Sequence, residues 1–339
     1  MTTPDIAALL NRCITARLPL ISPHHDNAVR LFNGFAEGLP TLSIDLYART
    51  VVIHDYTKSD FGDDALTDEA LKAVQKLLPW VTAAVVKVRH AKQLQTRNGR
   101  LTLGQEKDVA KRVRENGVAY AVAPMAQRDV GLYLDTRNLR EWLKKNLSGA
   151  RVLNTFAYTG SLGVAALAGG AREVIHTDMN KALLDVAKTS YSMNGFEISR
   201  SHFKVGDFFD VMGKLKREKG LFDCALVDPP YLSVTEQGRV ELEKEGARVL
   251  NRVRPLIADG GRLIVVNNAV FLSGAEFMKQ LEALCADGYS SIEETIAVAD
   301  DAAGFSATRV GAFAVDPAPF NHSTKIAVLR VKRKDGRTK

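Results

Sequence analysis

Carboxylates follow three apolar runs in the second half of the sequence, at Asp178, Asp207 and Asp228. A carboxylate at a strand end, about 20 residues after a glycine turn, can accept hydrogen bonds from both hydroxyls of a ribose, which suits Asp178. Asp207 lies in Val205-Gly206-Asp207-Phe208, where an acceptor next to an aromatic ring suits the amino group of an adenine. Asp178 has a plainer alternative as the cap of a helix over 180–194. Together the three carboxylates predict an edge that binds a nucleoside.

Two further strand ends carry residues that could orient a reacting group. The fourth predicted strand ends in Asp228-Pro229-Pro230-Tyr231, and the fifth ends in Asn267-Asn268. Two prolines fix the backbone outside a strand end, so its carbonyls can point at a reacting amine, and Tyr231 can stack on a base. The candidate catalytic residues are therefore Asp228, Pro229, Pro230, Tyr231, Asn267 and Asn268.

A glycine-containing turn follows the first of these strands, in Asn154-Thr155-Phe156-Ala157-Tyr158-Thr159-Gly160. Gly160 permits a tight turn, and Gly163 permits the next helix to pack closely on the sheet. The spacing differs from the GxGxxG of dinucleotide enzymes, and a purely structural turn is the alternative.

A regular alternation of strands and helices must position these residues. Apolar strands separated by helices of ten or more residues predict a doubly wound, mostly parallel sheet with both faces covered, whose ligand lies at the carboxyl ends of the strands. Four matching strand ends in the correct order predict a Rossmann-like class I methyltransferase that uses S-adenosyl-L-methionine. The predicted strands are 151–156, 173–178, 202–205, 222–227, 262–267, 291–298 and 325–331, and the predicted helices are 161–168, 180–194, 208–218, 237–257 and 274–286.

The first third of the chain has a different pattern. A short helix and a loop are expected over 1–25, strands over 41–46, 51–54 and 82–88, and an amphipathic helix over 64–78. We therefore expect a small α+β substrate-recognition domain over 1–118 and the methyltransferase domain over 119–339.

Positive charge is concentrated in two segments of a chain whose net charge is +7. Such clusters suit a phosphate-bearing partner, with a solvated face as the alternative. The sequence has no apolar stretch of membrane-spanning length and no signal-peptide pattern, which predicts a cytoplasmic protein. Its three cysteines, Cys13, Cys224 and Cys285, show no metal-ligand spacing, so no metal is expected. The basic residues are Lys87, Arg89, Lys92, Arg97, Arg100, Lys107, Lys111, Arg112 and Arg114 in 87–114, and Arg330, Lys332, Arg333, Lys334, Arg337 and Lys339 in 330–339.

The sequence resembles the bacterial large-subunit ribosomal RNA methyltransferases, which include cytosine-5 enzymes and a guanine-N7 relative. The resemblance rests on Arg30-Leu-Phe-Asn-Gly34, Gly38-Leu-Pro-Thr-Leu-Ser-Ile-Asp45, Gly131-Leu-Tyr-Leu-Asp-Thr-Arg137, the turn at Leu153–Gly160, Asn194-Gly195 and Asp228–Pro230, and covers roughly residues 28–270. It implies structured RNA as the partner, bound through segments 87–114 and 330–339, and leaves a homodimer open.

The resemblance also implies roles for individual residues. Gln127 to Arg137 would form the lip over the cofactor, the turn would surround its methionine end, and Asp178 and Asp207 would hold the ribose and the adenine. The full set of expected cofactor-binding residues is Gln127, Gly131, Tyr133, Asp135, Arg137, Asn154, Phe156, Ala157, Tyr158, Thr159, Gly160, Asp178, Met179, Asn180, Gly206, Asp207, Phe208 and Asp228.

Two departures from the family bear on the substrate. The sequence lacks the N-terminal RNA-binding module of many members, and it has no cysteine after the fifth strand, where cytosine-5 enzymes carry their nucleophile. Asn267-Asn268 resembles the guanine-N7 relatives instead. We therefore expect methylation of an RNA ring nitrogen without a covalent cysteine intermediate. The alternatives are a small-molecule or protein methyltransferase, and an RNA-binding or assembly factor without catalysis.

Overall fold

The structure is a computed structural model that describes residues 5–230, 232–235 and 238–338. The chain divides into two compact units. The first unit extends to Asp135 and includes Ala299–Ala312, and the second comprises Thr136–Val298 and Phe313–Lys339. The expected boundary between residues 118 and 119 therefore falls earlier than the division in the structure. The sequence also gave no sign that residues 299–312, here named the returning segment, belong to the first unit.

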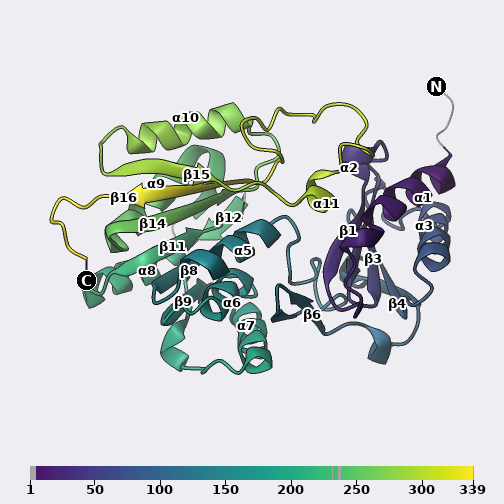
Figure 1. The fold of residues 1–339 in the computed structure, drawn as a ribbon, viewed down its shortest axis with the longest axis horizontal. Coiled ribbons are helices and arrows are strands. Elements are labelled where there is room, and N and C mark those ends of the chain that lie inside the picture. The colour runs from purple at the N-terminus through teal and green to yellow at the C-terminus, as the bar shows by residue number, and fades with distance from the viewer. Residues whose placement is uncertain (1–4, 231, 236–237, 339) are drawn as a thin grey trace. The chain divides into compact units, whose positions relative to one another are not determined.

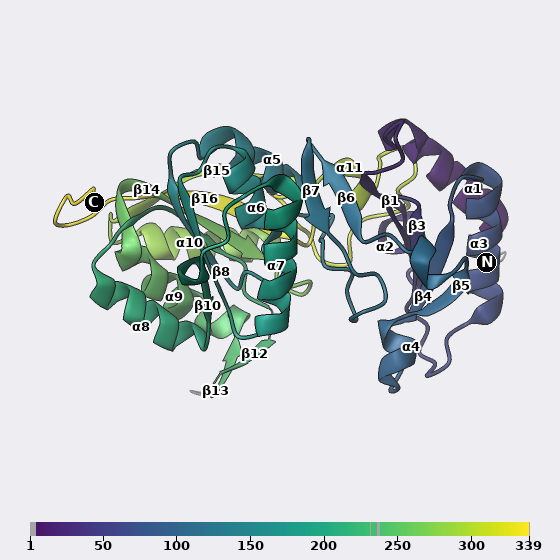
Figure 2. The same ribbon diagram turned by 90° about the horizontal axis from the view of Figure 1, so that it is seen from below.

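The first unit is built on a five-stranded sheet of order β1-β2-β3-β4-β5. Its strands are antiparallel except β3 and β4, which are parallel because helix α3 (Asp64–Leu77) crosses between them. Figures 1 and 2 show α3 and the N-terminal helix α1 (Ile6–Arg17) on the same side of the sheet. The strands are β1 (Ala28–Asn33), β2 (Leu42–Tyr47), β3 (Thr50–Asp55), β4 (Ala83–Val88) and β5 (Arg100–Leu103).

The core of this unit lies between that sheet and the two helices. Leu10 and Ile14 of α1 and Ala70 and Val74 of α3 are fully buried against one face of the sheet, among apolar side chains of β1 to β4. Strand register explains the pattern, because alternate residues of each strand point to this face. The other elements of the unit are α2 (Gly34–Glu37), α4 (Leu94–Asn98), the hairpin β6 (Arg112–Glu115) and β7 (Val118–Ala121), and α11 (Asp300–Ala303).

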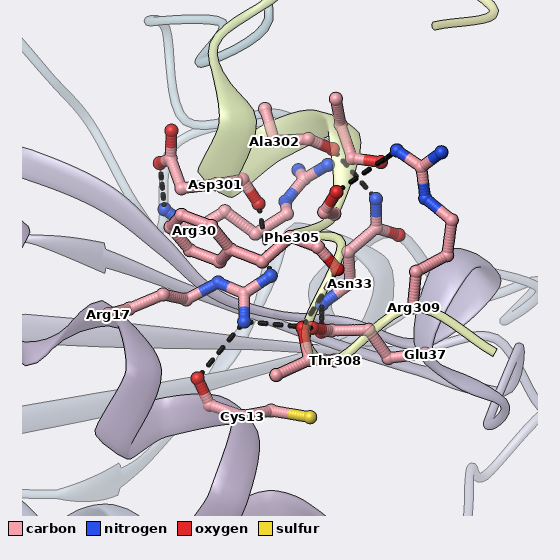
Figure 3. Close-up of polar contacts among 12 residues, drawn as sticks. Cys13, Arg17, Arg30, Asn33, Glu37, Asp301, Ala302, Phe305, Thr308 and Arg309 are labelled. Carbon is pink, nitrogen blue, oxygen red and sulfur yellow. Dashed lines mark hydrogen bonds and ion pairs between the residues drawn. The ribbon is translucent and has the colours of Figure 1, made fainter. Parts of the chain in front are cut away.

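A buried ion pair fixes the returning segment to the first unit. Arg17 Nη1 contacts Glu37 Oε1 at 2.8 Å, and both side chains are fully buried. Figure 3 shows Arg17 also reaching the returning segment, where it donates to the Asp301 carbonyl at 3.3 Å. Its guanidinium lies 4.8 Å from the centre of the Phe305 ring, and Thr308 Oγ1 donates to Glu37. Two segments far apart in the sequence thus share one buried polar cluster.

The motif at residues 30–34 holds the same segment. The backbone N–H of Arg30 donates to the Asp301 carboxylate at 2.9 Å, and Asn33 Nδ2 donates to the Ala302 carbonyl at 2.7 Å. Gly34 has no room for a side chain, because a Cβ would lie 2.0 Å from the Leu39 carbonyl oxygen. Residues 30–34 therefore form part of the surface on which the returning segment packs.

The second unit has the predicted α/β fold. Its seven-stranded sheet has the order β10-β9-β8-β11-β14-β16-β15, parallel from β10 to β14 and completed by antiparallel β16 and β15. Figure 1 shows the strands with helices on both sides. The strands are β8 (Arg151–Thr155), β9 (Glu173–Asp178), β10 (Phe203–Val205), β11 (Phe222–Val227), β14 (Ile257–Asn267), β15 (Ser290–Thr295) and β16 (Lys325–Val331).

Two apolar clusters divide the helices between the faces of this sheet. One contains Met212, Val253 and Phe277 from α8, α9 and α10, and the other contains Leu143 and Ala165 from α5 and α6. The helices are α5 (Arg137–Asn146), α6 (Ser161–Ala168), α7 (Lys181–Asn194), α8 (Phe208–Glu218), α9 (Leu242–Val253) and α10 (Gly274–Cys285).

The structure corrects three expectations in this unit. The helix expected over 237–257 is shorter, because β12 (Leu232–Thr235) and β13 (Gly238–Glu241) form a two-stranded sheet before α9 begins. Strand β14 begins at Ile257 rather than at residue 262. Helix α5 was not predicted, since only Leu139, Arg140 and Leu143 of this largely polar segment are buried. Among the described residues, no helix has the length and apolar character needed to cross a membrane.

Candidate functional site

The predicted site residues of the second unit come from strand ends on one edge of the sheet. Because β8, β9, β10, β11 and β14 are parallel, their carboxyl ends share that edge. The chain leaves β8 toward β9 on one side and reaches β11 on the other, so the switch point of the sheet lies between β8 and β11. A ligand is expected at this point in doubly wound sheets.

The loop after β8 has an unusual backbone. Phe156, Tyr158 and Gly160 all have positive φ angles, of 51°, 50° and 73°. Such angles are uncommon for residues with side chains and cluster at functional sites. The loop is tied to the next strand, since the Ala157 N–H donates to the Thr177 carbonyl at 3.0 Å. The backbone around the turn is therefore held in a specific shape.

Asp178 holds this loop with its carboxylate. Its Oδ2 accepts from the Tyr158 N–H at 2.8 Å, and its Oδ1 accepts from the Asn180 N–H at 2.8 Å. Burial raises the pKa of this carboxyl, and the backbone N–H bonds oppose that rise. The cap of helix α7 is Asn180 rather than Asp178, because Asn180 accepts from the Ala182 N–H. The sequence did not show this clamping role, and the ribose contact stays a prediction.

A buried histidine supports the loop from beneath. His176 is fully buried, with Asn154 Nδ2 at 3.1 Å from its Nδ1 and the Tyr191 hydroxyl at 2.8 Å from its Nε2. Burial lowers the pKa of His176 to about 3, so the ring is neutral. The Asn154 amide N–H can only donate, which assigns the ring proton to Nε2. Asn154 is 1% exposed, so its side chain supports the turn from within the sheet.

Close packing of neighbouring side chains explains Gly160 in the turn and Gly163 in helix α6. A Cβ at Gly160 would lie 2.5 Å from the Ala187 Cβ, and a Cβ at Gly163 would lie 2.4 Å from His176 Cε1. Any larger residue would push the loop away from its support. His176 was not among the predicted site residues, although its place in an apolar strand just before Asp178 was a signal.

The strand ends at β11 and β14 carry the catalytic candidates. Pro229 and Asn267 line a cavity of about 370 Å³, together with apolar residues of β11, β14, α9 and α10. Asn267 is 2% exposed and its Oδ1 accepts from the Ala269 N–H at 3.0 Å, whereas Asn268 is exposed. Asn267 therefore shapes the turn, whereas the side chain of Asn268 is open to solvent, and its contact with a substrate stays a prediction.

Lys325 fixes the same turn and was missed from the sequence. Its Nζ donates to the Ala269 carbonyl at 3.0 Å and to the Ser323 carbonyl at 2.6 Å, in a fully buried position at the start of β16. Burial lowers its pKa to about 8. Among the other candidates, Asp228 is partly exposed, Pro229 is buried and Pro230 is exposed. Tyr231 lies outside the described residues.

Comparison with known proteins decides the family. The sequence profile of S-adenosylmethionine-dependent methyltransferases matches residues 69–302. The chain belongs to this family. It is 30% identical over 281 residues to ribosomal RNA large subunit methyltransferase I of Aeromonas salmonicida. The aligned residues make up 82% of this chain and 70% of that protein. The enzyme of the same name from Erwinia tasmaniensis is 28% identical over 271 residues, or 79% of this chain and 67% of the relative.

Solved structures of similar fold include two methyltransferases. The methyltransferase SMU.776, solved in complex with SAH, has a TM-score of 0.81 and 22% identity, covering 96% of this chain and 81% of that one. A SAM-dependent methyltransferase from Streptococcus mutans has a TM-score of 0.78 with the same identity and coverage. These structures show the α/β fold, and S-adenosyl-L-methionine as the methyl donor follows from the family profile.

The residues that follow strand β10, Asp207 and Phe208, fit this cofactor. Asp207 is 8% exposed, and its Oδ1 accepts from the Phe209 N–H at 2.8 Å. Its Oδ2 is buried, and no described residue supplies it with a hydrogen-bond partner. A buried acceptor without a donor is costly, and the adenine amino group is the donor expected here. The rings of Phe156 and Phe208 stack at 4.6 Å next to this position, and Met179 is 53% exposed.

Four of the expected cofactor residues belong to the first unit. These are Gln127, Gly131, Tyr133 and Asp135, and their contact with the cofactor stays a prediction. The Tyr133 hydroxyl donates to Asp129 at 3.1 Å, and the Gln127 carbonyl accepts from Lys87 at 2.6 Å. Of the remaining predicted positions, Arg137 begins helix α5, Thr159 is 3% exposed, and Gly206 donates its N–H to the Asp178 carbonyl.

The basic segment 87–114 is less available than its composition suggests. Lys87 is fully buried and donates to the carbonyls of Asn98 and Gln127, so it is wrong to count it as a phosphate ligand. Burial and the neighbouring Arg89 lower its pKa to about 8. Arg89 itself pairs with Asp129 at 2.9 Å. Three exposed members also have acidic partners, Lys92 with Asp60, Arg100 with Asp64 and Arg114 with Asp26.

Proposed function

We propose that this methyltransferase modifies a base of structured RNA, with ribosomal RNA as the first candidate, at a ring nitrogen and without a cysteine adduct. The names of the relatives from Aeromonas and Erwinia support the class of substrate. The observation that carries the chemistry is the edge formed by β11 and β14, where Asn268 is exposed beyond buried Asn267. An rRNA substrate would place the reaction in the cytoplasm.

The cysteines support a mechanism without a thiolate nucleophile. Cys224 is fully buried inside β11, where burial raises its pKa to about 12. Cys13 is fully buried in the first unit, and burial and nearby Glu37 raise its pKa to about 11. Cys285 ends α10. A nucleophilic cysteine needs a depressed pKa and access to substrate, and neither Cys13 nor Cys224 has them.

The proposed reaction depends on placement rather than on acid–base chemistry. The bound cofactor supplies an electrophilic methyl group on its sulfonium. Guanine N7 carries no proton, so no general base is required when the nitrogen is held in line with the methyl group. Pro229 and Pro230 would fix the backbone carbonyls beside the nitrogen, and Asn268 would read the edge of the base. Asp228 would orient the base from the switch point of the sheet.

The RNA surface would use the basic residues that remain exposed. In the first unit these include Lys107, Lys111 and Arg112, and Arg112 lies on the outward side of strand β6. In the C-terminal segment, Lys332 and Lys334 are exposed, whereas Arg330 pairs with Glu293 and Arg333 with Asp335. A homodimer stays a prediction, which light scattering in solution tests.

The decisive experiment identifies the methylated nucleoside. Purified protein and isotope-labelled S-adenosylmethionine are incubated with bulk RNA that is then digested for mass analysis. We expect a ring-methylated purine, with 7-methylguanine first. A variant with Cys13, Cys224 and Cys285 replaced by Ala should keep most of its activity, apart from stability lost at Cys224. Asn268→Ala should lower turnover more than any single cysteine replacement.

Two outcomes would contradict the proposal. A product of 5-methylcytosine would exclude the ring-nitrogen chemistry, as would a single cysteine variant that folds, binds cofactor and is inactive. Label incorporated into protein or small molecules, with none in any RNA, would exclude the RNA substrate.

A further inference from the structure

The loop that joins strand β14 to helix α10 (Figure 1) carries two exposed apolar residues. Val270 is 53% exposed and Phe271 is 76% exposed. Their neighbours on either side, Ala269 and Leu272, are buried. The Leu272 N–H donates to the Ala269 carbonyl at 3.4 Å, so these four residues form a turn whose two corner residues are exposed. Asn268, which is proposed to read the edge of the methylated base, directly precedes this turn.

The turn is held at both ends. At its start, the Ala269 carbonyl also accepts from the buried Lys325 at 3.0 Å, and the Ala269 N–H donates to Asn267 at 3.0 Å. At its end, Ser273 caps helix α10, because its hydroxyl accepts from the Glu276 N–H at 3.2 Å while the Glu276 carboxylate accepts from the Ser273 N–H at 3.0 Å. These bonds restrict where the two corner side chains can lie.

The corner residues are not of the types that a turn favours. Corner positions usually hold Gly, Pro, Asn, Asp or Ser, because these residues adopt the dihedral angles of turns easily or bond to the nearby backbone. A valine and a phenylalanine offer neither advantage. Their exposure also leaves apolar surface in contact with water, which is unfavourable. The formation of the turn therefore does not explain why Val270 and Phe271 occupy its corner.

Exposed apolar side chains of the second unit are concentrated at the edge where ligands are expected. In the part of this unit that the structure describes, five large apolar residues are exposed. Four of them lie at the carboxyl ends of the parallel strands β9, β10 and β14, whereas Ile198 precedes β10 and lies at the opposite edge. Clustered apolar surface marks interaction sites, which scattered residues do not. The four are Met179, Val205, Val270 and Phe271.

The cofactor's adenine can account for only two of these four residues. Met179 follows β9 and Val205 ends β10, next to Asp207, where the adenine is predicted to bind. Phe271 follows β14, which lies on the other side of the switch point between β8 and β11. Three strand spacings separate β9 from β14, a distance of about 14 Å. An adenine over β9 and β10 therefore leaves Phe271 uncovered, on the side of the sheet proposed for the methylated base.

We propose that Phe271 is a stacking platform for an unpaired base of the RNA substrate, next to the base that is methylated, and that Val270 widens its apolar surface. An enzyme that modifies a base takes it out of the stack, which leaves a neighbouring base with an uncovered face. An aromatic ring can stack on any base, because every base has a π face. The bonds that hold the turn set the position of the ring before RNA binds. This inference rests on the proposed RNA substrate.

A tryptophan in place of Phe271 reports stacking directly. With Trp80→Phe and Trp142→Phe, the variant Phe271→Trp contains a single indole, whose fluorescence a stacked nucleobase quenches. Saturating S-adenosylhomocysteine fills the cofactor site and prevents turnover. The probes are a single-stranded RNA hexamer of mixed sequence and a long RNA duplex without unpaired bases. We expect the hexamer to quench the fluorescence and the duplex to leave it unchanged.

Three variants of the otherwise unchanged chain separate stacking from general apolar contact. Affinity for the labelled hexamer, measured by fluorescence anisotropy, should fall about 5- to 100-fold in Phe271→Ala, as expected for the loss of one stacked base. Phe271→Leu keeps apolar surface without the ring and should lose nearly as much. Ile198→Ala removes an exposed apolar side chain from the opposite edge and should leave the affinity unchanged. Affinity for S-adenosylmethionine should be the same in all three.

The outcomes separate this proposal from the proposed function. Fluorescence that the hexamer does not quench, or unchanged affinity in Phe271→Ala, would overturn the platform. A dimer that Phe271→Ala converts to a monomer in light scattering would assign the surface to a second copy of this chain and would overturn it as well. Quenching in a protein that methylates no RNA would retain the RNA contact and remove the RNA methyltransferase function. Methylated RNA with unquenched fluorescence would do the reverse.

Discussion

The two units each carry a motif of the family, and the motifs act in different ways. In the first unit, several polar groups of the stretch from Arg30 to Asp45 bond to other protein groups, notably Asp301 and Ala302 of the returning segment. In the second unit, the turn from Asn154 to Gly160 uses a histidine support and a carboxylate clamp to hold a strained backbone at the cofactor edge. The motif of the first unit therefore serves to assemble the protein, whereas the motif of the second unit holds a loop at the edge where the cofactor is predicted to bind.

The largest expected effect is the loss of stability of the first unit when the buried ion pair between Arg17 and Glu37 is broken. Arg17→Met leaves Glu37 buried without its cation, and removing one partner of a buried pair typically costs about 3–5 kcal/mol. The two tryptophans show which unit loses stability, because Trp80 lies in the first unit and Trp142 in the second. In a Trp142→Phe background, denaturation followed by Trp80 fluorescence reports on the first unit.

The control for Arg17 is an ion pair on the surface. Arg100→Met removes the exposed pair with Asp64 and should cost no more than about 1 kcal/mol. If both variants lose the same stability, the buried cluster does not hold the first unit together. Cofactor affinity should be unchanged in either variant once the protein is folded.

A smaller effect of a different kind is expected at Asp178. Asp178→Ala removes the proposed acceptor for the ribose and the acceptor for the Tyr158 N–H, and bonds to a charged group are typically worth about 1.5–3 kcal/mol. S-adenosylmethionine affinity measured by calorimetry should fall on the order of 10- to 100-fold. Asp178→Asn keeps one side-chain oxygen that can accept from the loop, so its affinity for S-adenosylmethionine should lie between those of the wild type and Asp178→Ala. Unchanged affinity in Asp178→Ala would remove this residue from the cofactor site.

The smallest expected effect is the change in the free energy of unfolding per pH unit that His176, beneath the loop after β8, contributes. The pKa of His176 is lowered from an ordinary value of about 6.5 to about 3 in the folded protein. Its contribution to stability is therefore fully present above pH 6.5 and is lost as pH falls from 6.5 toward 3, because the unfolded chain binds the proton first. The slope from this group approaches about 1.4 kcal/mol per pH unit in that window.

The measurement compares the wild type with His176→Phe. Unfolding of the second unit is followed through Trp142 in a Trp80→Phe background between pH 7 and pH 4. The variant should be less stable at pH 7 but should show a shallower dependence on pH. An equal slope in both proteins would show that His176 does not titrate on unfolding.

The same contrast explains what the sequence could predict. Strands β9, β11 and β16 and helices α6 and α8 begin and end at the predicted residues, because each is an apolar run bounded by turn residues. The clustering of Asp178, Asp207 and Asp228 at one edge follows from parallel strands. Those inferences need only the local pattern of apolar and turn residues, and the rule that the carboxyl ends of parallel strands share one edge of a sheet.

What the sequence could not show depends on contacts between distant segments. Composition alone did not separate Lys87 and Lys325 from surface lysines, and only the structure shows that both are buried. Each does interrupt or begin an apolar strand, and that was the available signal. The returning segment contacts the first unit through two carbonyls, one carboxylate, the Phe305 ring and the Thr308 hydroxyl. Many loops carry such groups, so no local feature of the sequence directs this segment to Arg17.

The returning segment also has a consequence for synthesis of the chain. A protein emerging from the ribosome folds from its N-terminus, and domains usually complete themselves in that order. Here the first unit cannot close its buried cluster until Thr308 has been translated, after residues 136–298 of the second unit. The first unit to appear is therefore completed only after most of the second unit has been made, although the second unit still needs strand β16. A fragment that stops at Asp135 would leave Arg17 and Glu37 without the groups that normally cover them.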